Sequence, residues 1–224
     1  MLGINAHSLG MLAQARRDFE AAEAWYRKSL AIKERLGEEQ SLASTSHQLG
    51  MLAQARRDFE SAEAWYRKSL AIKDRLGNDH GAAQTAHQLG TLHQERGDFA
   101  AAEGWYRKSL AIEEKIGNEH GAATTAHQLG ILAQERRDVA TAEEWYRKSL
   151  LIKEKLGDEH GAATTAHQLG ILAHERRDFA TAEGWYRKSL SVFEKLGDEL
   201  GAARTAHQLG AIAKTRRDFG AAEG

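Results

Sequence analysis

The sequence predicts an all-α protein, a solenoid built from tandem antiparallel helix-turn-helix repeats. The block HQLG starts at forty-residue intervals, at His47, His87, His127, His167 and His207, and a looser copy, HSLG, starts at His7. A fixed period of this length is typical of solenoids and propellers. The 224 residues include no proline, which fits helices joined by short turns. No strand-like alternation of apolar and polar residues competes with the helical pattern.

The repeats predict a single array over residues 1–224. Five full units cover 7–46, 47–86, 87–126, 127–166 and 167–206, and a partial unit covers 207–224. Neighbouring units are close copies: 127–166 and 167–206 differ at eight of forty positions. Such similarity indicates either recent duplication or deliberate idealisation by a designer.

Each unit reads as two helices with recognisable ends. In the unit that starts at His127, apolar residues recur at helical spacing before a polar break, where Asp138 is a suitable N-cap. A second amphipathic segment runs from Val139 to Leu156 and is followed by Gly157, a residue suited to a left-handed helix end. Asp158 then caps the first helix of the next hairpin.

Composition excludes several classes of function. The net charge is −1, from 31 basic and 32 acidic residues, so no overall field favours nucleic acid or an acidic membrane. No apolar run is long enough to span a bilayer, and the N-terminus lacks the pattern of a secretory signal. The absence of cysteine excludes disulfides, thiolate metal sites and cysteine nucleophiles. We expect a cytoplasmic protein.

The repeat pattern resembles that of the tetratricopeptide repeat family. The matching residues of one unit are Ala126, Leu129, Gly130, Ala133, Val139, Ala142, Tyr146, Ser149 and Leu150, and the frame holds in every full copy. The resemblance implies a right-handed α-solenoid that binds proteins and carries out no catalysis. The forty-residue length and the LG[ND] ending are similar to the extended repeats of kinesin light chains, spindle-orientation adaptors and bacterial signalling ATPases.

One departure from the family pattern concerns the turn inside each hairpin. The glycine common before the turn aspartate is kept only at Gly97, and arginine replaces it in the other copies, at Arg17, Arg57, Arg137, Arg177 and Arg217. Because arginine is a good helix former, we expect the first helix to run on to this residue.

The resemblance implies that the first helices of the hairpins line a concave groove. The glutamine before each Leu-Gly pair is the strongest binding candidate, since an amide both donates and accepts and so matches an extended peptide backbone. The alternative is that these amides bond only to an adjacent helix or to water. The full set of candidate groove residues is Gln48, Gln88, Gln128, Gln168, Gln208, His47, His87, His127, His167, Met51, Ile131, Ile171, Gln94 and Gln134. The positions of the carboxylate clamp used by chaperone-binding relatives hold His and Ile, Thr or Met, which disfavours that partner class.

The repeated histidines invite a metal-site hypothesis that geometry opposes. Packed helices lie about 8–10 Å apart, whereas imidazoles that share a zinc ion must each come within about 2.1 Å of it. A groove histidine that contacts a partner in a pH-sensitive way is an alternative, since histidine titrates near neutrality. No phosphate loop, zinc-protease motif or nucleophile elbow occurs, so we expect no catalytic residues and no cofactor.

These observations leave three functions open. The first is a non-catalytic scaffold that binds an extended peptide or a helix of a partner protein in the groove. The second is a self-stacking structural array, natural or designed, with head-to-tail contacts between copies. The third is the sensor arm of a larger signalling ATPase. We expect protein or peptide partners and neither nucleic acid nor membrane.

Overall fold

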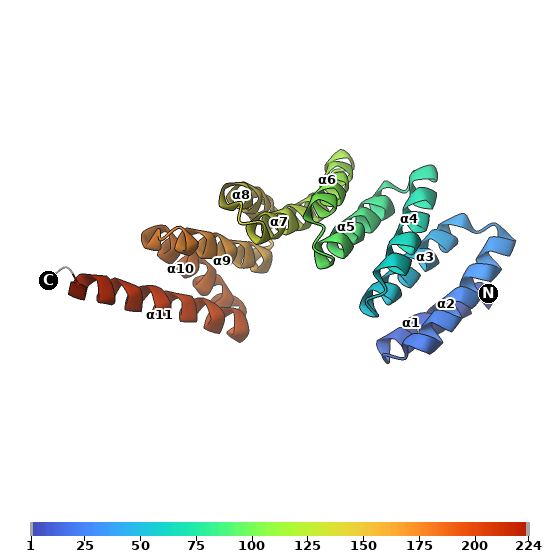
Figure 1. The fold of residues 1–224 in the computed structure, drawn as a ribbon, viewed down its shortest axis with the longest axis horizontal. Helices are drawn as coiled ribbons and strands as arrows, with labels where there is room; N and C mark the ends of the chain where they lie inside the picture. Colours follow the sequence, from blue (N-terminus) through green and yellow to red (C-terminus); the bar gives the residue numbers. More distant parts are fainter. Residues whose placement is uncertain (1, 223–224) are drawn as a thin grey trace. The chain divides into compact units, whose positions relative to one another are not determined.

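The computed structural model describes the backbone of residues 2–222 and the side chains of residues 5–215. These residues form eleven α-helices in succession and no strand (Figure 1). The helices are α1 (Leu2–Ala15), α2 (Phe19–Leu36), α3 (Glu39–Ala55), α4 (Phe59–Arg75), α5 (Asp79–Glu95), α6 (Phe99–Lys115), α7 (Glu119–Glu135), α8 (Val139–Leu156), α9 (Glu159–Glu175), α10 (Phe179–Leu196) and α11 (Glu199–Ala222). The predicted all-α solenoid of antiparallel hairpins is confirmed.

The chain divides into two compact units, Met1–Gly117 and Asn118–Gly224. In unit 1 the hairpins are α1–α2, α3–α4 and α5–α6, and each hairpin also packs on the next. In unit 2 the hairpins α7–α8 and α9–α10 are followed by α11, which packs on α10. We call the odd-numbered helices A and the even-numbered helices B.

The predicted N-caps Asp138 and Asp158 and the predicted left-handed Gly157 are confirmed. Asp138 begins α8 by accepting a hydrogen bond from the backbone amide of Thr141 at 3.2 Å. Asp158 does the same for α9 through Gly161 at 2.9 Å, and Gly157 before it has φ = 70°. Each cap satisfies an amide that the first helical turn leaves free.

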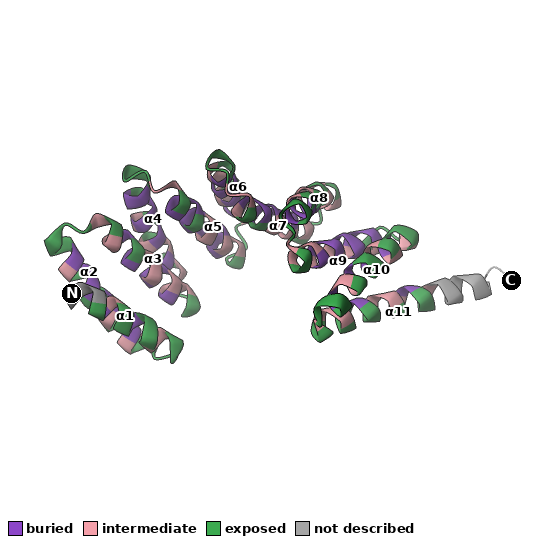
Figure 2. Cartoon of the chain, turned by 180° about the vertical axis from the view of Figure 1, so that it is seen from behind, coloured by how far each residue is buried: buried purple, intermediate pink, exposed green. Residues whose placement is uncertain are grey.

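The core lies between the two helices of each hairpin and, within each unit, between successive hairpins, as the buried residues in Figure 2 show. In α7 and α8, Leu129 and Tyr146 are fully buried. Gly130 is required there because a Cβ on it would lie 2.5 Å from the Tyr146 ring. The Leu-Gly pair thus lets the helix A backbone sit directly against the helix B tyrosine.

The turn inside the hairpins corrects one expectation from the sequence. Helix α7 ends at Glu135, and Arg137 adopts a left-handed conformation with φ = 60° instead of extending the helix. The same holds at Arg17, Arg57 and Arg177. The backbone amide of Asp138 bonds to the carbonyl of Ala133 at 2.9 Å, which closes the helix end and imposes the turn on whichever residue precedes the aspartate. Only α11 continues through the corresponding residue, Arg217.

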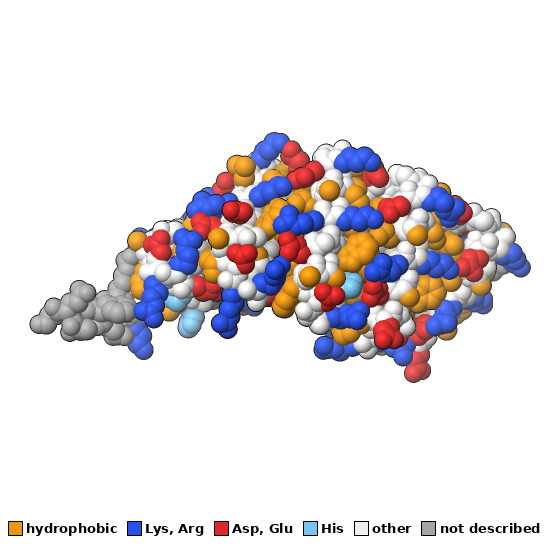
Figure 3. Space-filling model, turned by 45° about the horizontal axis from the view of Figure 1, so that its top comes forward, with side chains coloured by type: hydrophobic (Ala, Val, Ile, Leu, Met, Phe, Trp, Pro, Cys, Tyr) orange, Lys and Arg blue, Asp and Glu red, His pale blue; other side chains and the backbone are white. Residues whose placement is uncertain are grey.

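Ion pairs between successive hairpins cover much of the surface. On the face shown in Figure 3, basic and acidic side chains lie next to one another. Arg56 bonds to Glu23 at 2.6 Å, and Arg96 bonds to Glu63 at 2.9 Å. Exposed pairs of this kind contribute about 0–1 kcal/mol each. Among the described residues, no helix has the length and apolar character needed to cross a bilayer.

Candidate functional site

The glutamine before each Leu-Gly pair lies half-buried on a helix A. We call these residues the glutamine ladder: Gln48 and Gln88 in unit 1, and Gln128, Gln168 and Gln208 in unit 2. The threonines that face the histidines and the second glutamine of helix A, such as Gln54 and Gln134, have partners, whereas the structure gives the ladder amides no hydrogen bond to any described residue. The ladder therefore offers donors and acceptors that the fold itself does not use.

The second group of predicted glutamines has a different place. Gln134 accepts a hydrogen bond from the hydroxyl of Tyr146 at 3.0 Å and donates one to Glu175 of the next helix A at 3.0 Å. Gln94 accepts from Tyr106 at 2.8 Å. These two amides join helix A to its helix B, so they hold the site in place.

The predicted groove histidines are held from two sides. The Nδ1 atoms of His47 and His127 lie 3.2 and 3.1 Å from the hydroxyls of Thr85 and Thr165 on the next helix A. His167 contacts Thr205 in the same way at 2.9 Å. The rings of His47, His87, His127 and His167 also pack on the buried tyrosines of their own hairpins, with centroids 5.2–5.4 Å apart. The histidines thus connect successive repeats within a unit.

Burial changes the titration expected of these histidines. Burial and, to a smaller extent, the nearby ammonium groups of Lys73 and Lys153 together lower the pKa of His47 and of His127 to about 4. The expectation that these groups titrate near neutrality is therefore wrong, because the protonated ring would be desolvated next to a like charge. At neutral pH both side chains are neutral.

A buried lysine completes this contact, which the sequence did not reveal. Lys73 donates to the hydroxyl of Thr85 at 2.8 Å, and Lys153 donates to that of Thr165 at 3.0 Å. Burial lowers the pKa of Lys73 to about 8. Each threonine hydroxyl thus meets a lysine from helix B and a histidine from the preceding helix A.

The predicted apolar row is half-buried. Met51, Ile131 and Ile171 each pack partly against a core cluster and leave the rest of the side chain exposed. They follow the ladder residue of the same helix by three positions, which places both on one helical face.

One cavity of about 280 Å³ opens beside the ladder in unit 2. It brings together three predicted residues, His167, Gln168 and Ile171. Its other walls include Phe193, Leu200 and Arg204, which were not among the predicted binding residues. Their signal in the sequence was present, because all three depart from the preceding repeat.

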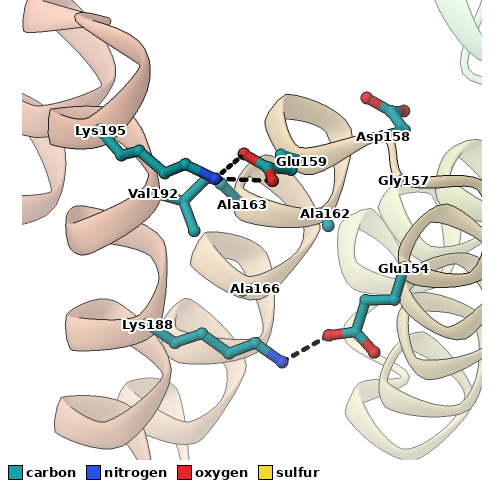
Figure 4. Close-up of a pocket in the computed structure, with 10 residues that line it drawn as sticks. All are labelled: Glu154, Gly157, Asp158, Glu159, Ala162, Ala163, Ala166, Lys188, Val192 and Lys195. Carbon is teal, nitrogen blue, oxygen red and sulfur yellow. Dashed lines mark hydrogen bonds and ion pairs between the residues drawn. The ribbon is translucent and has the colours of Figure 1, made fainter.

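A second cavity of unit 2, of about 290 Å³, lies between α8, α9 and α10 (Figure 4). Its floor is Ala162, Ala163 and Ala166. Lys195 bonds to Glu159 at 2.7 Å at its edge, and Lys188 pairs with Glu154. The charges around this cavity are therefore matched within the protein. Among the described residues, no cluster of histidine, aspartate and glutamate could hold a metal ion.

Comparisons with solved structures show the same fold. BtubC (BKLC) from P. vanneervenii superposes with a TM-score of 0.78 at 24% identity, over 92% of this chain and 87% of that one. A Rap protein complexed with competence and sporulation factor gives 0.65 at 16% identity, over 95% and 64%. The signal-transduction ATPase with a tetratricopeptide repeat sensor from Pyrococcus horikoshii gives 0.78 at 13% identity, over 96% of this chain but 35% of that protein.

No curated protein matches the sequence. The family model described as tetratricopeptide repeat matches residues 3–75, 41–115 and 121–195, which together are well over half of the chain. The matched residues include the Leu-Gly pairs, the core tyrosines and the capped turns described above. The chain therefore belongs to the tetratricopeptide repeat family, whose members generally act as scaffolds for protein interactions.

Proposed function

We propose that the helix A face binds an extended segment of a partner protein and that the glutamine ladder contacts the backbone of this segment. Each unit has its own helix A face: Gln48, Gln88 and Met51 with the residues between them in unit 1, and Gln128, Gln168, Gln208, Ile131 and Ile171 with the residues between them in unit 2. The observation that carries the proposal is the set of half-buried ladder amides without a partner among the described residues. A polar group that is partly removed from water loses hydration, and a ligand that restores its hydrogen bonds gains affinity.

An extended segment suits this arrangement better than a folded surface does. The backbone of an extended segment presents N–H donors and C=O acceptors that no secondary structure uses. Each glutamine carboxamide can bond to one such donor and one such acceptor. The neighbouring apolar side chains give the segment's own side chains a surface to pack on. Because these features repeat, recognition extends over several hairpins, and each contact adds a modest amount.

The histidine–threonine contacts support the proposal by fixing the face. Each joins two successive helices A within a unit, so the spacing between ladder residues is held before a ligand arrives. Pre-organisation of this kind reduces the entropy lost on binding. A protein with the same fold, the Rap protein named above, was solved in complex with competence and sporulation factor.

Selection from a random-peptide display library tests the proposal. Two variants serve as counter-screens: Gln48→Ala with Gln88→Ala in unit 1, and Gln128→Ala with Gln168→Ala in unit 2. We expect peptides that bind the parent protein and are lost on one of the two variants, which also identifies the unit that binds. Replacement of the same glutamines by methionine is the matched control for volume and must give the same loss. No enrichment, or enrichment that both variants retain, would contradict the proposal.

A second candidate function is self-stacking, which the exposed side of α1 favours. Leu9 and Leu12 are 40% and 48% exposed, whereas the equivalent Leu49 and Leu52 are 2% exposed beneath the preceding hairpin. An apolar face of this kind can be covered by a second copy in a head-to-tail contact. Light scattering over a range of concentrations should then show association that Leu9→Gln with Leu12→Gln removes. A strict monomer at high concentration would contradict it.

The third alternative, a sensor arm of a signalling ATPase, would use the same helix A face. In that case a ligand on the face controls a catalytic domain outside this chain. The peptide selection above tests the binding step that both functions share.

A further inference from the structure

The last full repeat carries a concentrated set of changes around one cavity. Of the eight positions at which 167–206 differs from 127–166, three line the 280 Å³ cavity beside Gln168. Lys153 corresponds to Phe193, His160 to Leu200, and Thr164 to Arg204. The three are well separated in the sequence and meet only in the folded protein.

The first two changes make the cavity apolar. The ammonium group of Lys153 donates a hydrogen bond to the hydroxyl of Thr165. Phe193, in the equivalent position, is buried, and its ring packs on that of His160 with centroids 5.6 Å apart. Leu200 is 61% exposed at the edge of the same cavity. With Ile171, these side chains form an apolar wall where the preceding repeat has a cation and an imidazole.

The third change adds a positive charge that the protein does not neutralise. Arg204 is exposed and forms no ion pair with any described residue. The one carboxylate in the cavity wall, Asp198, is already engaged: it accepts from the amide of Gly201 at 2.9 Å and contacts Nε2 of His160 at 3.1 Å. The cavity therefore combines an apolar wall, a free guanidinium and the unpaired amide of Gln168.

We infer that this cavity is a specificity pocket of the helix A face. It takes one large apolar side chain of an extended peptide, and Arg204 binds the carboxylate of an adjacent Glu or Asp side chain. This inference rests on the proposed function and adds the sequence that the peptide must carry. The volume is near the lower end of ligand pockets, about 300–1,000 Å³, which suits one or two side chains. Guanidinium groups bind carboxylates through paired, charge-assisted hydrogen bonds.

Two peptide pools test the inference. Both contain ten-residue peptides with acetylated and amidated ends and random positions around a central pair. The pair is Leu, Phe or Trp followed by Glu in one pool and by Gln in the other. The protein should retain the Glu pool about tenfold more strongly, and this preference should decrease as salt is added. Free-acid peptides with the Gln pair form a third arm, which shows whether a terminal carboxylate substitutes for the side chain.

The variants restore residues that the preceding repeat already accommodates, so the fold tolerates them. Arg204→Thr should remove the preference for Glu over Gln. Phe193→Lys with Leu200→His should weaken both pools. Thr124→Arg is the matched control, because it places arginine at the equivalent position of an earlier repeat, outside the cavity, where Glu113 and His120 stand in place of Phe193 and Leu200. It should give no new preference.

The outcomes separate this inference from the proposed function. If the protein retains both pools equally, and if this binding is still lost when Gln128 and Gln168 are replaced, the specificity pocket alone is overturned. A preference for Glu that survives Arg204→Thr would also overturn it, as would stronger binding of the free-acid arm than of the Glu pool. Failure of every pool to bind would overturn both.

Discussion

The buried tyrosines of unit 2 show how one side chain decides whether a hydroxyl is satisfied. Tyr146 donates its hydroxyl hydrogen to Gln134, but the residue equivalent to Gln134 in the next repeat is His174. The hydroxyl of Tyr186 is consequently buried without a hydrogen-bond partner among the described residues. Two chemically identical tyrosines in one unit therefore differ in what their hydroxyls contribute.

This difference predicts opposite responses to the same substitution. Tyr146→Phe should lower the free energy of unfolding by about 1 kcal/mol, because it leaves the Gln134 carbonyl without its donor. Tyr186→Phe should be neutral or stabilising, since it removes a buried hydroxyl that has no partner. Urea unfolding of the two variants gives the comparison, and an equal loss in both would contradict the assignment.

The buried histidines predict a pH dependence of stability. In the unfolded chain the pKa of histidine is about 6.5, whereas His47 and His127 have a pKa of about 4 in the folded protein. Between these values the unfolded state binds more protons, so stability is complete above pH 6.5 and is lost as the pH falls towards 4. Each histidine should account for about 1–2 kcal/mol between pH 7.5 and pH 5. Denaturant unfolding at both pH values measures this, and His47→Asn with His127→Asn should flatten the slope.

At the level of single residues, the sequence predicted local hydrogen bonds, such as helix caps, better than contacts between residues of different helices. The caps Asp138 and Asp158 were predictable because capping depends only on neighbours within the same turn. The different states of Gln128 and Gln134 were not, since the sequence does not show which of the two lies within reach of the Tyr146 hydroxyl. The pKa of His127 was missed for a similar reason, because its burial, and after that the nearby ammonium group of Lys153, depend on how the helices pack.

At the level of the helices, the hairpin turn carries strain in most repeats. An L-residue in the left-handed region costs about 1–2 kcal/mol, and Arg137 adopts this conformation at φ = 60°. Gly97 occupies the equivalent position at φ = 77° without that cost. Helix propensity alone predicted that the arginine would extend the helix, but the capped start of helix B decides where helix A ends.

Arg137→Gly should therefore stabilise the protein. We expect a gain of about 0.5–1 kcal/mol, which is the relief of the left-handed strain less the larger entropy of glycine in the unfolded chain. The reverse change, Gly97→Arg, is the matched control and should destabilise by a similar amount. Thermal and urea unfolding of both variants measure the effect. A loss of stability in Arg137→Gly would show that the arginine side chain contributes more than its conformation costs.

At the level of the whole molecule, the fold was predictable because the repeat period, the helix signals and the family pattern agree. The site was predictable in outline only. Its repeated part follows from the sequence period, whereas the pocket at Phe193, Leu200 and Arg204 depends on which departures from the repeat meet in space. The proposed specificity thus rests on positions that depart from the repeat and lie together in the fold.

The central claim is that the ladder amides bind the backbone of an extended peptide. The most direct test is the affinity of a selected peptide and of a series with one backbone amide methylated at a time, measured by calorimetry on the parent protein and on Gln128→Ala with Gln168→Ala. The account predicts that methylation at particular positions weakens binding about tenfold on the parent protein and has little further effect on the variant, because the lost bond is the same one. Equal losses on both proteins, or no sensitivity to methylation, would contradict the claim.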